Sequence, residues 1–155
     1  MATEQHIPNT TRPTRRNNTA ERIVTGIHSF FYRLSGGRLG GRIGKSPVLL
    51  LTTTGRKSGQ ARTTPLFYIR DGDNLVLIAS HGGAPTHPTW WLNLQAKPEA
   101  EVEIQGKRLR VRARQASVEE HQRLWPRMVD MYGGYAEYQK KTTREIPVVI
   151  LEPQS

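Results

Sequence analysis

Residues 48–69 read VLLLTTTGRKSGQARTTPLFYI, and this stretch decides the fold. Two runs rich in β-branched and apolar residues predict strands over residues 48–54 and 62–70. The Gly-Arg-Lys-Ser-Gly sequence between them favours a turn, because glycine adopts backbone conformations that other residues avoid. The two strands should therefore pair as a hairpin. Pro65 has no backbone N–H, so the second strand should be bulged or lie at a sheet edge there.

Three cationic side chains, Arg56, Lys57 and Arg62, lie at or beside the tip of this hairpin. Like charges at one turn repel each other, so either the turn is simply solvated or an anion binds there. A fork-shaped guanidinium and a point-charge ammonium are natural partners of phosphate, and the glycines of the turn leave backbone N–H groups accessible. The spacing alone leaves both interpretations open.

Further strands are predicted downstream of the hairpin. The Asp-Gly-Asp-Asn sequence at residues 71–74 predicts a turn into a third strand at 75–80. Two alternating runs, residues 101–104 and 108–114, flank a Gln-Gly turn and set glutamates opposite arginines. We interpret those arginines as a solvated sheet face. A last strand is expected at residues 146–151.

Helical segments surround these strands. Residues 19–34 place apolar side chains at helical spacing, which predicts an amphipathic helix. A short helix is expected at residues 88–96. Residues 117–120, Ser-Val-Glu-Glu, form a capping-box sequence that opens a third helix, and Pro126 should kink or break it. Another short helix should cover residues 135–142, after two glycines.

The order of these elements predicts a mainly β fold. Mostly sequential antiparallel strands joined by hairpins favour a small closed or half-closed barrel with helices packed outside. The chain has 155 residues, which fits one domain. We expect residues 1–18 to be a disordered basic arm and residues 19–155 to form the single domain, with the amphipathic helix at its start.

The positive charge of the chain is concentrated at its beginning. The net charge is +10, and residues 1–62 hold 11 Lys and Arg against two acidic residues. This asymmetry points to an anionic partner. Nucleic acid is not expected, since no recognition module is present. The helix at 19–34 fits an anionic bilayer surface, but it could equally pack on its own barrel or on a partner subunit, as in a homodimer.

Cysteine is absent, which excludes disulfides and thiolate metal sites and fits a reducing cytoplasm. No run approaches the roughly 18 apolar residues of a membrane-spanning helix. The expected location is therefore the cytoplasm, with the inner face of the cell membrane as the alternative. The histidines lack the usual metal-ligand spacing, so no metal is expected. Tyr132, Tyr135 and Tyr138 form either a pocket wall or a packing face.

Four separated motifs carry a resemblance to a known family. They are TTTGRKSGQARTTPL, LIASHGGAPTHPTWWLNLQAKP, LWPRMVDMYGGYAEYQ and IPVVILEP, and they cover about residues 47–153. In this order they resemble the deazaflavin-dependent nitroreductase family, the F420H2-dependent quinone and nitro reductases. The resemblance implies a split β-barrel related to the FMN-binding, pyridoxamine-phosphate-oxidase-like proteins, and coenzyme F420 as cofactor.

The resemblance also implies roles for individual residues. Lys57, Arg62 and Arg56 match positions that grip the phosphodiester and polyglutamate tail of F420, which gives the hairpin cations an anionic partner. Contacts to the rest of the cofactor are implied for Pro65, Ala79, Ser80, His81, Gly82, Gly83 and Trp90. His81 stands where the family usually has lysine.

The same resemblance implies hydride transfer from reduced F420 to a quinone, enone or nitroaromatic acceptor. Ser80 matches a serine beside the reacting centre, and Tyr132, Tyr135 and Tyr138 match tyrosines that cover the substrate. Phe67 stands where nitro-drug-activating members carry tyrosine, so a quinone or enone is the expected acceptor. Two alternatives stay open, a basic barrel that binds membranes peripherally and a flavin or haem protein on the same fold.

Overall fold

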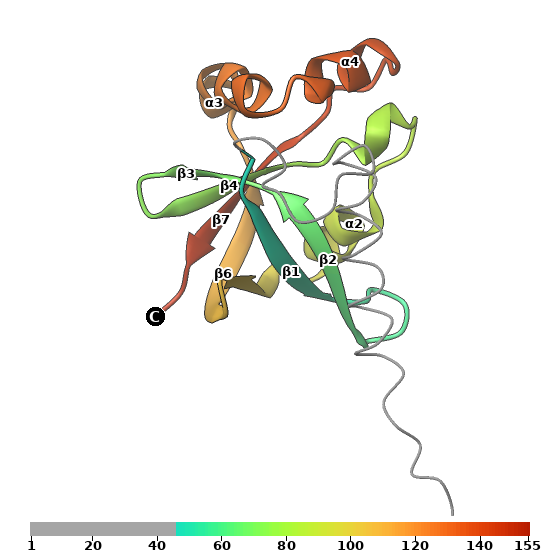
Figure 1. The fold of residues 1–155 in the computed structure, drawn as a ribbon. Coiled ribbons are helices and arrows are strands. Elements are labelled where there is room, and N and C mark those ends of the chain that lie inside the picture. Colours follow the sequence, from blue (N-terminus) through green and yellow to red (C-terminus); the bar gives the residue numbers. More distant parts are fainter. Residues whose placement is uncertain (1–45) are drawn as a thin grey trace, which may run out of the picture.

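The computed structural model describes residues 46–155, which form one curled antiparallel sheet with helices packed against it (Figure 1). The basic arm predicted at residues 1–18 and the amphipathic helix predicted at 19–34 lie outside the described residues. Those two predictions therefore stay predictions.

Seven strands make up the sheet in the order β2-β1-β5-β6-β7-β4-β3, and all neighbouring pairs are antiparallel. The strands are β1 (Val48–Thr54), β2 (Ala61–Phe67), β3 (Ile69–Asp71), β4 (Asn74–Ile78), β5 (Glu99–Ile104), β6 (Lys107–Gln115) and β7 (Val148–Pro153). The helices are the 3-10 turn η1 (His81–Gly83), α2 (Thr89–Ala96), α3 (Val118–Met131) and α4 (Gly134–Lys140). The mainly β half-barrel with helices outside is confirmed.

The two edge strands of the sheet, β2 and β3, follow each other in the chain, and the curl of the sheet brings these two edges together. β2 pairs with β1 at one edge, and β3 pairs with β4 at the other. Tyr68 joins the two edges, and its N–H donates to the carbonyl oxygen of Pro47 at 3.3 Å. The single strand predicted at residues 62–70 is therefore wrong, because the chain passes from one edge to the other at Tyr68. Pro65 lies on the edge strand β2, as predicted.

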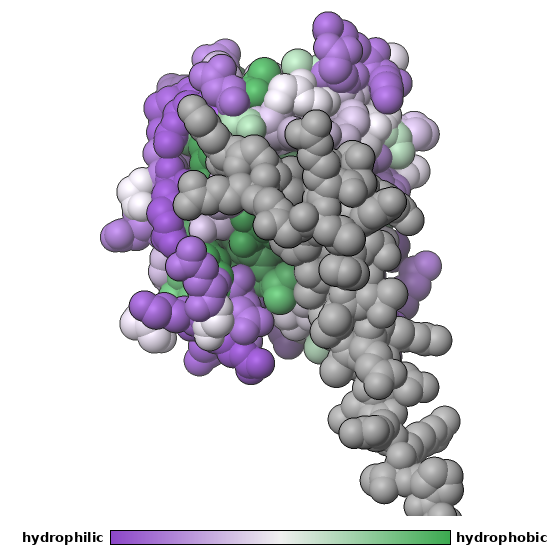
Figure 2. Space-filling model, in the orientation of Figure 1, coloured by the Kyte–Doolittle hydropathy of each residue, from purple (hydrophilic) through white to green (hydrophobic). Residues whose placement is uncertain are grey.

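Two apolar clusters occupy opposite faces of the sheet. The inner cluster takes alternate residues of β1, such as Leu49 and Leu51, and is closed by Trp90 and Trp91 of α2. The outer cluster takes the other faces of β4 and β7, packed under α3 and α4, and contains Phe67. In Figure 2, hydrophobic residues are visible towards the middle of the face that contains β1, with hydrophilic residues to their left and below them. Period-two alternation thus separates the two clusters.

Several predicted boundaries shift by one or two residues. The predicted strand at 75–80 is β4, which ends at Ile78, and the predicted strand at 146–151 is β7, which starts at Val148. Pro147 has no N–H, so it cannot donate to the ladder, although its carbonyl accepts from Ala79 N–H at 3.0 Å. The break considered at Pro126 does not occur, since α3 continues through this residue as one helix.

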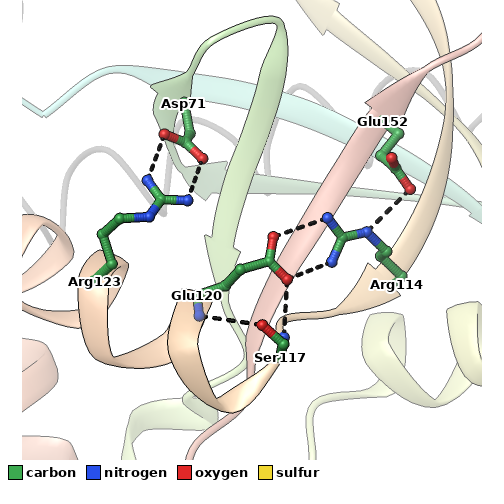
Figure 3. Close-up of polar contacts among 6 residues, drawn as sticks. All are labelled: Asp71, Arg114, Ser117, Glu120, Arg123 and Glu152. Carbon is green, nitrogen blue, oxygen red and sulfur yellow. Dashed lines mark hydrogen bonds and ion pairs between the residues drawn. The ribbon is translucent and has the colours of Figure 1, made fainter.

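A polar network fixes the start of α3 to the sheet (Figure 3). The capping box is present, with Glu120 N–H donating to Ser117 Oγ at 3.2 Å and Ser117 N–H donating to Glu120 Oε1 at 3.0 Å. Arg114 of β6 donates to both carboxylate oxygens of Glu120, at 2.7 and 2.9 Å, and to Glu152 of β7 at 3.1 Å. Arg114 is therefore an anchor for α3, and its interpretation as part of a purely solvated face is wrong.

The arginines earlier on β6 do lie on an exposed face. Arg112 is exposed and donates to Glu99 of β5 at 2.7 Å, and Arg108 lies 3.7 Å from Glu101. The predicted cross-strand pairing of glutamates with arginines is thus confirmed. Such exposed pairs contribute only tenths of a kcal/mol each.

Candidate functional site

A cavity of about 480 Å³ lies beside the β1–β2 turn. Its lining comes from the end of β1, the turn, the start of β2 and one side of α2. The lining residues are Thr53, Gly55, Arg56, Lys57, Ser58, Arg62, Thr63, Thr64, Thr89, Trp90 and Asn93. The structure therefore brings the three predicted cations together with Trp90 around one space.

The turn that carries the cations is closed by its own backbone. Gly55 N–H donates to the carbonyl of Gln60 at 2.7 Å, and Gly59 N–H donates to the carbonyl of Gly55 at 2.7 Å. Gly59 has φ +69°, a conformation that favours glycine. Arg56 and Lys57 are consequently exposed at the tip.

Asn93 anchors this turn to α2. Its side-chain Oδ1 accepts a hydrogen bond from Arg56 N–H at 3.0 Å, and its Nδ2 donates to Thr53 Oγ1 at 3.1 Å. Asn93 is 2% exposed, so both bonds are shielded from water. The sequence analysis missed this residue. Its polar side chain at a buried position of an otherwise apolar helix is the signal that could have pointed to it.

Hydroxyl groups line the cavity beside the cations. Thr53 and Thr64 come from the paired strands β1 and β2, and Thr63 Oγ1 lies 2.8 Å from Thr52 Oγ1 across the same ladder. Trp90 adds an apolar surface and is 7% exposed. The cavity thus combines fixed positive charge, neutral hydrogen-bonding groups and one aromatic ring. This combination suits a ligand with an anionic part and a flat or polar part.

The remaining predicted cofactor residues are not among those that line the cavity. Pro65 lies further along β2, and Ala79, Ser80, His81, Gly82 and Gly83 follow β4. Ser80 is 9% exposed, and its hydroxyl has no hydrogen-bond partner among residues 46–155. His81 adopts φ +48°, and its Nδ1 lies 3.1 Å from the carbonyl oxygen of Thr86.

The two glycines of η1 have different surroundings. A Cβ on Gly82 would meet no atom within 4 Å, so one side of this residue is open. A Cβ on Gly83 would lie 2.7 Å from the carbonyl oxygen of Tyr138, so the absence of a side chain lets η1 pack directly on α4. Gly83 also has φ +82°.

Four aromatic rings cluster where β2 ends against α4. Tyr132 lies at the centre, with ring centroids 5.1 Å from Phe67, 5.1 Å from Tyr135 and 6.1 Å from Tyr138. The hydroxyl oxygens of Tyr132 and Tyr138 lie 3.0 Å apart. The three tyrosines are therefore brought together, and Phe67 joins them. Tyr135 is buried, while Tyr132 and Tyr138 are half-buried.

Burial raises the pKa of two of these tyrosines, Tyr132 and Tyr135. Burial, followed by the hydrogen bond and the charge of Tyr138, raises the pKa of Tyr132 to about 12. Burial also raises the pKa of Tyr135 above its ordinary value. Both hydroxyls therefore remain hydrogen-bond donors at neutral pH.

Gly134 makes room for the central ring. A Cβ at this position would lie 2.5 Å from two ring carbons of Tyr132. The absence of a side chain at Gly134 therefore allows the Tyr132 ring to pack against the start of α4.

The cationic cavity and the aromatic cluster lie at opposite ends of β2. In Figure 1 the β1–β2 turn lies at one end of this strand, and α3 and α4 lie towards the other. Arg62 is at the start of the strand and Phe67 at its end. At about 3.3 Å per residue, the five steps between them span roughly 17 Å. One extended strand thus connects a charge-binding end to a ring-lined end.

Comparison with known proteins points to one family. The sequence model of the family described as F420H(2)-dependent quinone reductase matches residues 24–153. The chain is 44% identical over 129 residues to an F420H(2)-dependent quinone reductase of Mycobacterium tuberculosis strain H37Rv. That match covers 81% of this chain and 87% of the relative.

Solved structures give a matching result. The structure of an F420-H2 dependent reductase, FDR-A, is 43% identical, has a TM-score of 0.63 and covers 68% of this chain and 94% of its own. A domain-swapped dimer is 35% identical, with a TM-score of 0.64, covering 86% and 99%. A Listeria innocua protein described as a pyridoxamine 5′-phosphate oxidase is 10% identical, with a TM-score of 0.51 over 83% and 94%, and shares the fold alone.

Two further features concern only residues 46–155. No group of three or more His, Cys, Asp or Glu side chains there could hold a metal ion. No helix in the same range is long and apolar enough to cross a membrane.

Proposed function

Because the chain belongs to the F420H(2)-dependent quinone reductase family, we propose that it is an oxidoreductase that uses reduced coenzyme F420 to reduce a quinone. The observation that carries this proposal is the cavity that joins Arg56, Lys57 and Arg62 to Trp90. An oxidoreductase with a polyanionic cofactor needs such a cationic groove.

The residues of the cavity fit the chemistry of F420. Its tail carries a phosphodiester and several carboxylates, and three cations with exposed side chains face the space where the tail would lie. Charge-assisted hydrogen bonds are roughly twice as strong as neutral ones. Binding would also relieve the mutual repulsion of the three cations. Asn93 holds the turn in place through Arg56 N–H, so the cations are presented from a fixed backbone.

We assign the ring-binding and reacting region to the segment after β4, together with Pro65 of β2 and Trp90 of α2. When bound, reduced F420 supplies a hydride from C5 of its deazaflavin ring. The residues proposed to surround that ring are Pro65, Ala79, Ser80, His81, Gly82, Gly83 and Trp90. Ser80 is the proposed donor to the negative charge that develops on the acceptor oxygen, and its hydroxyl has no competing partner among the described residues.

The acceptor is proposed to lie against the ring cluster of Phe67, Tyr132, Tyr135 and Tyr138. These rings offer flat apolar faces to a flat electrophile, and the protonated hydroxyl of Tyr132 can donate to its oxygen. Phe67 contributes no hydroxyl to this cluster. We therefore propose quinones or enones as the preferred acceptors over nitroaromatic compounds.

The first test mixes the purified protein with reduced F420 and menadione. We expect protein-dependent return of the visible absorbance of oxidised F420. Lys57→Glu should weaken F420 binding by about a hundredfold, because it replaces an attraction with a repulsion at the tail. Fluorescence titration of F420 measures this, with Lys107→Glu as the matched control, since Lys107 is an exposed lysine at the start of β6.

The serine is tested separately from the cations. Ser80→Ala should lower kcat by about tenfold or more with little change in the Kd for F420, because the hydroxyl acts on the developing charge and not on the tail. Equal losses in binding for Ser80→Ala and Lys57→Glu would contradict the division of roles between the two ends of the site.

Assembly and location remain predictions that accompany this function. The domain-swapped dimer among the related structures supports a test for a homodimer by light scattering of the full-length protein. A peripheral contact with anionic membranes is tested by sedimentation with vesicles that contain anionic lipid. Retention of the protein in the supernatant at low salt would contradict it.

A further inference from the structure

We propose that Arg144 is a positioning residue that locks the loop at residues 79–87 and the tyrosine segment of α4 into one unit. This inference rests on the proposed function, because that loop contains the assigned Ser80 and α4 contains Tyr135 and Tyr138. Arg144 lies in the connection between α4 and β7.

The guanidinium of Arg144 donates to several carbonyl groups of the loop. Its Nε donates to the carbonyl oxygen of Ala84 at 3.0 Å, and its Nη2 donates to that of Ser80 at 2.9 Å. Both terminal nitrogens reach the carbonyl oxygen of Ala79 at 3.4 Å. Its Nη1 also lies 3.1 Å from Nδ1 of His87. One side chain thus holds both ends of the loop.

The chemistry of this contact requires an arginine. A planar guanidinium has five donors in a fixed fork, and here they meet acceptors in three directions. No carboxylate among residues 46–155 pairs with Arg144, so backbone dipoles balance its charge. Burial lowers the pKa of Arg144, although the group stays protonated. Burial followed by the charge of Arg144 lowers the pKa of His87, which favours an unprotonated Nδ1 that can accept.

The backbone of Arg144 is in turn fixed to α4. Gln139 Nε2 donates to the carbonyl oxygen of Arg144 at 2.8 Å, and Gln139 Oε1 accepts from Ile146 N–H at 2.9 Å. Gln139 directly follows Tyr138 in the helix. On the other side, Gly83 packs on the backbone of Tyr138 without a side chain between them. The loop and α4 are therefore connected twice, once through Arg144 and once through Gly83.

The consequence is a fixed separation between Ser80 and the tyrosines. Arg144 donates a hydrogen bond to the carbonyl oxygen of Ser80. Tyr138 directly precedes Gln139, whose side chain donates to the carbonyl oxygen of Arg144. Loss of the guanidinium should allow the loop to shift relative to α4 while the hairpin cations stay in place. A misplacement of about 1 Å can cost about a hundredfold in rate. Catalysis should therefore suffer more than tail binding.

The kinetic test compares Arg144→Lys with Arg112→Lys, the latter removing the fork of an exposed arginine on β6. Arg144→Lys should lower kcat by about tenfold or more and change the Kd for F420 by less than about threefold. Arg144→Ala should behave alike, and added guanidinium ion should restore part of its kcat. Gln139→Leu, a second variant, should reproduce the pattern of Arg144→Lys. Unchanged kcat in Arg144→Lys and Gln139→Leu would overturn the proposal.

Hydrogen exchange tests the connection independently of activity. Arg144→Lys should raise the exchange of amides in residues 79–87 and in α4 together, whereas Arg112→Lys should raise neither. Faster exchange in the loop alone would overturn the proposed link to α4. If the wild-type protein does not oxidise reduced F420 with menadione, the proposed function fails, and the exchange experiment still decides whether Arg144 joins the two segments.

Discussion

Tyr132 contacts all three other rings of the aromatic cluster, which makes it the residue through which the cluster is organised. Its hydroxyl group faces that of Tyr138, and its ring lies against the backbone of Gly134. The hydroxyl contact joins two side chains, and the ring contact requires that residue 134 has no side chain. A single substitution in this cluster should therefore have a measurable effect on Tyr132.

At this scale we expect Tyr138→Phe to lower the pKa of Tyr132 from about 12, while keeping it above 10. The substitution removes the hydrogen bond and the charge of the second phenol, but burial, the largest cause, remains. NMR titration of labelled tyrosine rings measures the change. Tyr68→Phe is the control, since Tyr68 belongs to the inner cluster. An unchanged Tyr132 pKa in Tyr138→Phe would mean that the two phenols do not interact.

The sequence could predict some residues of the site and not others. The cations of the hairpin were identifiable because a tight turn places its side chains at one point, and in the structure Arg56, Lys57, Arg62 and Trp90 line one cavity. Arg144 could not be predicted. Its partners are backbone carbonyl groups about 60 residues away, and a carbonyl group carries no signature in the sequence.

Among the elements, α3 depends most on polar contacts with the sheet. Its first turn is tied to β6 and β7 through Glu120, Arg114 and Glu152, as Figure 3 shows. One helical turn further on, Arg123 donates to both carboxylate oxygens of Asp71, at 2.8 and 2.9 Å. The hydrogen bond from Arg123 is the largest cause that lowers the pKa of Asp71. α3 thus covers the outer cluster and is held at two points.

We expect Glu120→Gln to lower the free energy of unfolding by about 1–2 kcal/mol at neutral pH, because the amide keeps the capping geometry but loses the charge that faces Arg114. The hydrogen bond from Arg114 is the largest cause that lowers the pKa of Glu120 from 4.5 to about 2. A depressed pKa stabilises the fold above pH 4.5, and this stabilisation is lost as the pH falls through about 2.

Urea denaturation at neutral pH and at low pH measures this effect. The difference between wild type and Glu120→Gln should shrink as the pH falls towards the folded-state pKa. Glu119→Gln is the matched control, because Glu119 lies in the same exposed helical turn and makes no ion pair among the described residues. Equal losses in the free energy of unfolding of the two variants would mean that the carboxylate acts through the helix dipole and not through its contact with Arg114.

The elements themselves were largely predictable, since hairpin turns and the capping box leave local signals. The strand at residues 62–70 was predicted as one element because its composition is uniform. The structure divides it at Tyr68, where the chain moves from one sheet edge to the other. That division arises from the curl of the whole sheet, which no window of a few residues contains.

For the whole molecule, the distribution of charge should govern cofactor affinity. Residues 63–155 hold 12 Lys and Arg against 11 acidic residues, so the positive excess lies at the hairpin and before it. We expect the Kd for F420 to rise by about tenfold or more between roughly 0.05 and 0.5 M salt, because screening shortens the reach of the exposed cations. Fluorescence titration measures this.

The control for the salt series is Lys57→Glu, whose weaker binding should depend less on salt. An equal salt dependence in both proteins would mean that the attraction comes from elsewhere in the chain. The half-barrel was predictable from the order of elements, because antiparallel strands joined by hairpins favour this arrangement.

Because β2 is a regular strand, its length fixes the distance between the hairpin cations and the aromatic cluster. Each residue advances the chain by about 3.3 Å, and successive side chains point to opposite faces of the sheet. An insertion or deletion in β2 that keeps Phe67 on the same face must therefore contain an even number of residues, and each pair changes the length of the strand by about 6.6 Å. One inserted residue between Arg62 and Phe67 would turn Phe67 away from the tyrosines. With the tail of F420 at the hairpin, as proposed, tails of different length would extend beyond the hairpin tip, and the ring-lined end would keep its distance.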